Sequence, residues 1–116
     1  MKQEHVYFVN IVIPVVYYIG VNAIDNFKVI DMGKPTDYWF HAADISSCHV
    51  VVNIPHDIDN KQLKTIIKRG ALICKQHTLK LKTLKRVEII YTRICNTTKT
   101  DITGSVTVTN PKSIIC

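Results

Sequence analysis

Apolar positions recur at helical spacing in one segment near the middle of the chain. They follow one another at intervals of three and four residues: Leu63, Ile66, Ile67, Gly70, Ala71 and Cys74. This spacing places all six on one buried face of an α-helix. Asp57 or Asp59 precedes the segment, and either side chain can cap its first turn. We therefore expect one long amphipathic helix after one of these caps.

The opposite side of this helix is basic. At about 100° per residue, four lysines fall within an arc of roughly 60° away from the apolar face. They are Lys61, Lys64, Lys68 and Lys75. Leu72 projects among them, which is unusual for a plain solvated face. The predicted helix thus combines an apolar stripe with a row of lysines.

Short runs rich in β-branched and aromatic residues surround the helix and predict strands. These runs are Val6–Ile13, Val15–Ile19, Tyr38–Ala42, Ser47–Ile54, Val87–Arg93 and Ser105–Thr109. Residues 79–86 alternate apolar and basic positions and are expected to extend into the strand at 87–93. Residues 22–31 are interpreted as a loop or short helix, and residues 97–101 as a loop. The pattern predicts an α+β fold in which antiparallel strands pack against one long helix.

Chain length and hydropathy limit this fold to a single domain, residues 1–116. No charge-free apolar run reaches 18 residues, so no spanning helix is predicted. The apolar stretch Val6–Ile19 resembles a secretion signal, but Glu4 and Pro14 and the β-branched residues around them favour a strand. A cytoplasmic location is the expectation that follows.

The four cysteines predict neither a metal site nor a disulfide framework. Cys48, Cys74, Cys95 and Cys116 lie far apart and form no CxxC pair. Each replaces an apolar residue in a helix-like or strand-like pattern, as a small buried hydrophobe would. Cys74 and His77 imitate half of a zinc knuckle, but no second half follows. We expect reduced thiols, no metal and no cofactor.

Charge divides the chain into two unlike halves. Residues 1–60 carry three lysines and seven acidic residues, whereas residues 61–116 carry twelve basic residues and two acidic ones. A basic half on a compact domain attracts polyanions, either nucleic acid or anionic lipid. Twelve lysines against three arginines favour point-charge contacts with phosphate over bidentate base readout. The predicted phosphate contacts are Lys61, Lys64, Lys68, Lys75, Lys80, Lys82, Lys85 and Arg86.

A second cluster contains the residue types that could act in catalysis. It comprises Asp37, Trp39, Phe40, His41, Ser46, Ser47, Cys48 and His49. A hydrolase needs a nucleophile in hydrogen-bond reach of a base, and these residue types include both. No nucleophile elbow, phosphate-binding loop or other catalytic signature frames them, so an enzyme is the less favoured alternative.

Recognition is the other use of this cluster. Trp39 and His41 share one face of the predicted strand, and an open face would stack an unpaired base. Trp39 as a filler of the core is an equal alternative. Pairing His41 with His49 would place all three rings together, and a shift of one residue would separate them. The sequence leaves this register open.

Two motifs in this region resemble a known family. Gly33-x-Pro35-x-Asp37-x-Trp39-Phe40-His41 is followed by Ser46-Ser47-x-His49-Val50. With weaker agreement over residues 6–110, this pattern resembles the NFACT RNA-binding domain, formerly a domain of unknown function, in its stand-alone, coiled-coil-containing type. The chain departs from the family at Cys48, where a small residue such as alanine is usual.

The resemblance implies an RNA-binding module and no enzyme. Larger members work on the large ribosomal subunit with tRNA in quality control, and a stand-alone relative binds extracellular DNA. The expected partner is therefore an RNA of translation, either tRNA or ribosomal RNA, and DNA is the alternative partner. No membrane partner is expected. Trp39, His41 and His49 are candidates for base contact or for holding the binding loop, with Asp37 orienting a histidine and Phe40, Ser46 and Ser47 in support. A docking adaptor that uses Leu72 among the lysines is the remaining alternative.

Overall fold

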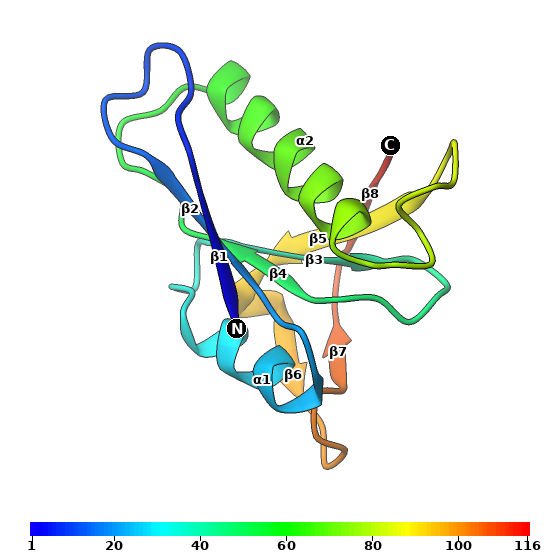
Figure 1. Ribbon diagram of the computed structural model, residues 1–116. Coiled ribbons are helices and arrows are strands. Elements are labelled where there is room, and N and C mark those ends of the chain that lie inside the picture. The colour runs from blue at the N-terminus through cyan, green and yellow to red at the C-terminus, as the bar shows by residue number, and fades with distance from the viewer.

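A computed structural model describes all residues, 1–116, and has an α+β architecture, as predicted (Figure 1). Its elements follow the order β1 (Lys2–Val6), β2 (Val15–Ile19), α1 (Ala23–Asp31), β3 (Tyr38–Ala42), β4 (Val50–Val52), α2 (Asn60–Gln76), β5 (Glu88–Arg93), a 3₁₀ turn (Ile94–Asn96), β6 (Thr97–Lys99), β7 (Val106–Val108) and β8 (Lys112–Ile115). No helix is long and apolar enough to cross a bilayer.

Six strands form one antiparallel sheet in the order β1-β2-β4-β3-β5-β8, and β6 pairs with β7 in a separate hairpin. The predicted long helix, α2, lies across one face of the sheet, and α1 and the β6–β7 hairpin lie on the other side (Figure 1). Successive side chains of β4 point to opposite faces of the sheet, so they belong to two separate cores. Val50 and Val52 join the main core beneath α2, whereas Val51 joins a smaller core with Val29 of α1 and Trp39.

The amphipathic pattern of α2 is confirmed. Asp59 is the N-cap, and it exchanges hydrogen bonds with Gln62 in a capping box. Five of the six residues predicted for the apolar face are buried, and Leu63 is partly buried. A Cβ at Gly70 would collide with the Phe40 ring, so this glycine lets the helix approach β3 closely.

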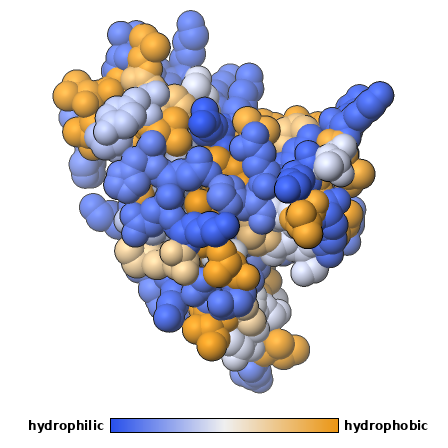
Figure 2. All heavy atoms as spheres, viewed as in Figure 1, coloured by the Kyte–Doolittle hydropathy of each residue, from blue (hydrophilic) through white to orange (hydrophobic).

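The first predicted strand is wrong in its position. β1 is the polar segment Lys2–Val6, and the apolar residues after it form the loop that joins β1 to β2. Asn10 has a positive φ of 67° there, which a strand does not permit. Tyr7, Val9 and Val12 are therefore exposed, and Figure 2 shows hydrophobic residues at this tip of the molecule.

Residues 79–86 are not the predicted basic strand. Hydrogen bonds from Leu81 to Thr78 and from Leu84 to Leu81 wind this segment into successive turns. Only Leu81 among its leucines is fully buried, and it anchors the segment to the main core. The predicted strand at 47–54 contracts to β4, and β6 occupies part of the predicted loop at 97–101.

Candidate nucleic-acid interface

Exposed cations gather along α2 and the turns that follow it. We call Lys61, Lys64, Lys68 and Lys75 the lysine face of α2, and Lys80, Lys82, Lys85 and Arg86 the basic turn segment. All eight are exposed except Lys75, which is half-buried. The ion pairs of the chain lie elsewhere, between Met1 and Asp25, His77 and Glu4, and Lys99 and Asp31. None of the eight predicted phosphate contacts forms an ion pair with a carboxylate.

The fold holds these cations in a fixed arrangement. The apolar side of α2 packs on β2, β3, β4 and β5, which turns its lysine face outward. Figure 2 shows hydrophilic residues over the part of the surface where α2 lies in Figure 1. The buried Leu81 fixes the basic turn segment directly after the helix. The two groups of cations are therefore continuous along the chain and anchored to one core.

The rings of Trp39, His41 and His49, here called the His–Trp cluster, lie together. The β3–β4 register pairs Phe40 with Val50, which is the register that places His41 beside His49. Trp39 Nε1 donates a 3.1 Å hydrogen bond to His49 Nδ1. The His41 ring stacks parallel to Trp39, with 5.7 Å between centroids and 4° between planes. Its edge-on contact with His49 has a centroid distance of 4.8 Å.

Burial keeps both histidines of the cluster neutral. Desolvation, with a smaller contribution from the charge of His41, lowers the pKa of His49 to about 3. Desolvation also lowers the pKa of His41, against the opposing effect of its hydrogen bond to the Ala42 carbonyl. Since His49 Nδ1 accepts from Trp39, the proton of its neutral ring is on Nε2. At neutral pH the cluster offers aromatic surface and no charge.

Trp39 is not an open stacking platform. Only 3% of its surface is exposed, and it packs between Val29 of α1 and Val51 of β4. Trp39 is therefore the filler of the smaller core, which is the alternative that the sequence left open. His41 is half-buried and is the ring of the cluster with more exposed surface.

The prediction that Asp37 orients a histidine is wrong. Its buried carboxylate accepts hydrogen bonds from the backbone amides of Lys34 and Ile54 and from Asn53 Nδ2. These bonds fix the turn before β3 to the end of β4. Asp37 consequently positions the start of β3, at the opposite end of that strand from His41.

The other supporting residues brace the fold or face solvent. Phe40 is fully buried in the main core. Ser47 Oγ accepts from the Ala42 amide and donates to the Cys48 carbonyl, while Ser46 is exposed. No hydrogen bond joins Ser46, Ser47 or Cys48 to a histidine. The nucleophile–base pair that the hydrolase alternative requires is thus not formed.

All four cysteines are free thiols. Cys48 Sγ donates to the Cys74 carbonyl, and Thr78 Oγ1 donates to Cys48 Sγ, both at 3.4 Å. Hydrogen bonds to its sulfur lower the pKa of Cys48, whereas the contact with Cys48 and burial raise the pKa of Cys74. No three His, Cys, Asp or Glu residues lie close enough together to hold a metal ion. These thiols join the end of α2 to the loop before β4.

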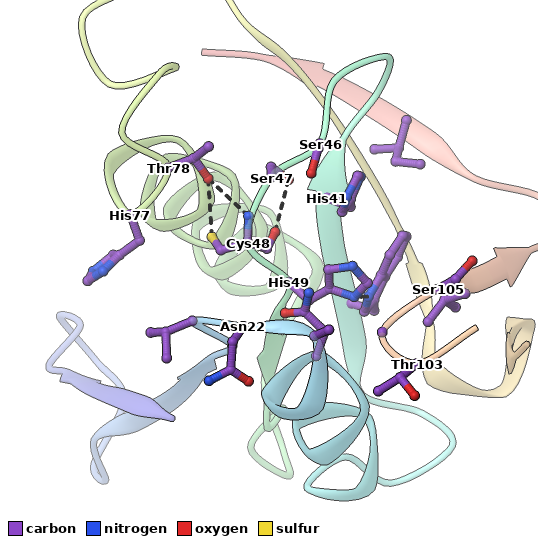
Figure 3. A pocket seen from close by; sticks show the side chains of 18 of the residues that line it. Asn22, His41, Ser46, Ser47, Cys48, His49, His77, Thr78, Thr103 and Ser105 are labelled. Atoms are coloured by element: carbon purple, nitrogen blue, oxygen red, sulfur yellow. Dashed lines mark hydrogen bonds between the residues drawn. The ribbon is translucent and has the colours of Figure 1, made fainter. Parts of the chain in front are cut away.

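A cavity of about 980 Å³ lies beside the His–Trp cluster. Its walls come from the start of α1, the loop before β4, the residues after α2 and the loop before β7. Figure 3 shows Thr103 and Ser105 on one side of this space, with Asn22 at the start of α1 and His41 and Ser46 from other segments. Of the eight predicted phosphate contacts only Lys80 lines the cavity, and Lys2 is a second cation there. Sequence reasoning missed Lys2, Asn22, Thr103 and Ser105, which only the folded chain brings together.

Comparisons with known proteins agree on one family. The model of the NFACT protein RNA binding domain matches residues 5–110. The coiled-coil domain-containing protein 25 homolog of Dictyostelium discoideum is 31% identical over 84 residues, which cover 72% of this chain and 41% of that protein. Coiled-coil domain-containing protein 25 of Danio rerio is 31% identical over 98 residues, which cover 81% of this chain and 47% of that protein.

A solved structure supports the fold. The C-terminal part of the fibronectin/fibrinogen-binding protein from Streptococcus suis superimposes with a TM-score of 0.74 at 22% identity, over 87% of this chain and 40% of that one. The chain spans less than half of the length of each of these relatives. Since the family model covers nearly all of its residues, the chain belongs to the NFACT RNA-binding domain family.

Proposed function

We propose that this protein binds RNA through phosphate contacts from the lysine face of α2 and the basic turn segment. The observation that carries the proposal is that these cations, seven of them exposed, follow one another along α2 and the turns after it and that none forms an ion pair. Membership of an RNA-binding domain family supports it independently. The proposed activity is binding, not catalysis.

Lysine ammonium groups suit phosphate contact without base selection. Each is a compact charge on a flexible stem, so it follows a backbone phosphate in any sequence. Since each contact releases counterions, the affinity falls with salt in proportion to the number of phosphates neutralised. The proposed targets are structured RNAs of translation, tRNA and ribosomal RNA, encountered in the cytoplasm. DNA of equal charge is the alternative that the binding assay separates.

The test reverses two charges on the lysine face. Lys64→Glu/Lys68→Glu is compared with Lys34→Glu/Lys112→Glu, which makes the same change in net charge at exposed positions outside this surface. Binding of a tRNA, a single-stranded RNA and DNA of matched length is measured by fluorescence anisotropy between about 50 and 200 mM salt.

We expect the first variant to weaken binding to all RNA sequences alike. On single strands its slope of log K against log salt should become shallower by about 1.4, or about 0.7 for each lost phosphate contact. The control pair should retain most of the affinity and the slope. Equal losses in both variants would show a response to net charge only and would contradict a localised interface. Tighter binding to DNA than to RNA would assign the surface to DNA.

A second candidate function is docking on an acidic protein. Leu72 is 36% exposed among the lysines of α2, an arrangement that suits a protein partner better than a phosphate backbone. The absorbance ratio at about 260 and 280 nm after gentle purification distinguishes the two functions, because only the first predicts copurified nucleic acid. Leu72→Ser should leave RNA affinity unchanged if RNA is the partner.

A further inference from the structure

The cavity beside the His–Trp cluster has the charge of an anion-binding site. Two lysines, Lys2 and Lys80, line it, and no aspartate or glutamate is among its 23 lining residues. Its volume of about 980 Å³ lies at the upper end of the range for small-molecule sites, roughly 300–1,000 Å³. The cavity therefore has room for a flat aromatic group together with a phosphate.

One wall of the cavity is aromatic and rigid. The His41 ring packs parallel to Trp39 and at a steep angle to His49, and Trp39 is itself fixed by its hydrogen bond to His49. Because His41 is half-buried against this stack, it presents an ordered ring with little freedom to lose on binding. Val106, Val108 and Ile90 add apolar surface nearby.

Polar groups surround this wall. The side chains of Ser46, Thr103 and Ser105 line the cavity, and Figure 3 draws no hydrogen bond from any of them to the other residues shown. Asn22 caps α1 through its side-chain oxygen, so its amide nitrogen remains available as a donor. These groups supply the donors and acceptors that a base edge or a ribose requires.

We propose that this cavity takes one unpaired nucleotide of a bound RNA, with the base against His41 and the adjoining phosphate at Lys80. This inference rests on the proposed RNA-binding function and names the form of RNA that the protein selects. Lys80 belongs both to the basic turn segment and to the cavity wall. An RNA strand bound along the basic turn segment consequently reaches the cavity without leaving the cationic surface.

The cavity predicts a preference that the lysines alone do not give. A base within a duplex cannot enter it, whereas a base in a single-stranded tail can be placed on the aromatic wall. Stacking and edge contacts of one base correspond to a gain in affinity of about tenfold or more. A hairpin RNA with an unpaired tail should therefore bind more tightly than the same hairpin with a blunt end.

Trp39 gives a direct optical signal for this event, since it is the single tryptophan of the chain and lines the cavity. The full chain is titrated with a tailed and a blunt hairpin RNA while its tryptophan fluorescence and the anisotropy of labelled RNA are recorded. The tailed RNA should change the fluorescence and bind about tenfold more tightly. The blunt RNA should bind without changing the fluorescence.

Two variants and a matched control locate the effect. Ser46→Glu places a carboxylate at the exposed rim of the cavity, and Thr36→Glu adds the same charge at an exposed turn before the other end of β3. Ser46→Glu should abolish the preference for the tail, leaving blunt-hairpin binding close to that of Thr36→Glu. His41→Ala, with its thermal melting checked, should also abolish the preference because the stacking surface is gone.

The outcomes separate the two proposals. Binding of neither RNA would overturn the RNA-binding function, and the cavity assignment with it. Equal binding of both RNAs with unchanged tryptophan fluorescence would overturn the cavity assignment alone. Adenosine 5′-monophosphate that binds as tightly as the tailed RNA would overturn it too, because the cavity would then serve a free nucleotide.

Discussion

His49 makes the stability of this protein depend on pH in a calculable way. The folded protein protonates this ring only near pH 3, whereas the unfolded chain does so near its ordinary pKa of 6.5. Below pH 6.5 the unfolded state therefore binds a proton that the folded state excludes. The stabilisation is fully present above pH 6.5 and is lost progressively as the pH falls toward 3.

The size of the loss follows from these two pKa values. Between the unfolded pKa and pH 5, a gap of about 1.5 pH units, the free energy of unfolding falls by about 2 kcal/mol. Its limiting slope is about 1.4 kcal/mol per pH unit. His41 acts in the same direction, because burial also lowers its pKa. No carboxylate lines the cavity beside these rings, so no nearby acid compensates for a proton on His49.

Urea denaturation between pH 7.5 and 4.5 measures this loss, with His49→Gln as the control. Glutamine does not titrate, and its oxygen can still accept the hydrogen bond from Trp39 Nε1. The free energy of unfolding of the wild type should fall about 2 kcal/mol further than that of the variant by pH 5. Parallel curves for the two proteins, or an NMR titration of His49 near pH 6.5, would refute a neutral buried His49.

Three substitutions test how the fold positions the two surfaces. Gly70→Ala should cost about 1–3 kcal/mol of unfolding free energy, because the new methyl group meets the Phe40 ring, and a neutral result would show that α2 can move away. Asp37→Ala should cost about 3 kcal/mol, because three donors lose their acceptor, and thermal melting measures it. Asp59→Ala should cost about 1 kcal/mol through loss of the helix cap, whereas Asp59→Asn should cost much less.

The sequence predicted α2 well because its signals are local. The apolar spacing, the lysine row and the choice of caps all lie within about 20 residues, and the helix satisfies each of them. The segment after it forms turns, although its alternation of leucine and lysine has the period of a strand. Among its leucines only Leu81 is buried in the core. The segment forms the i to i+3 hydrogen bonds of turns and does not pair with another strand.

The β-strands at the sheet edges depended on contacts that the sequence does not reveal. β1 is polar and has one buried residue, Val6, so no apolar pattern marks it. β8 was not predicted, since a short segment after Pro111 forms a strand only because β5 offers it an edge. The sequence likewise does not determine the His41–His49 register, and strand pairing in the folded sheet decides it.

The lysine face and the cavity lie in different parts of the molecule, and this separation makes their energies distinguishable. The lysine face points away from the sheet, whereas the cavity adjoins the smaller core and the residues just after α2, and it meets the basic turn segment only at Lys80. Substitutions that share no partner contribute additively to free energy within about 0.5 kcal/mol. The combination of Lys64→Glu, Lys68→Glu and Ser46→Glu should therefore weaken binding of a tailed hairpin RNA by the product of the separate factors. A combined loss no greater than that of the lysine pair would mean that the cavity binds nothing independently, and the tail preference would then require another origin.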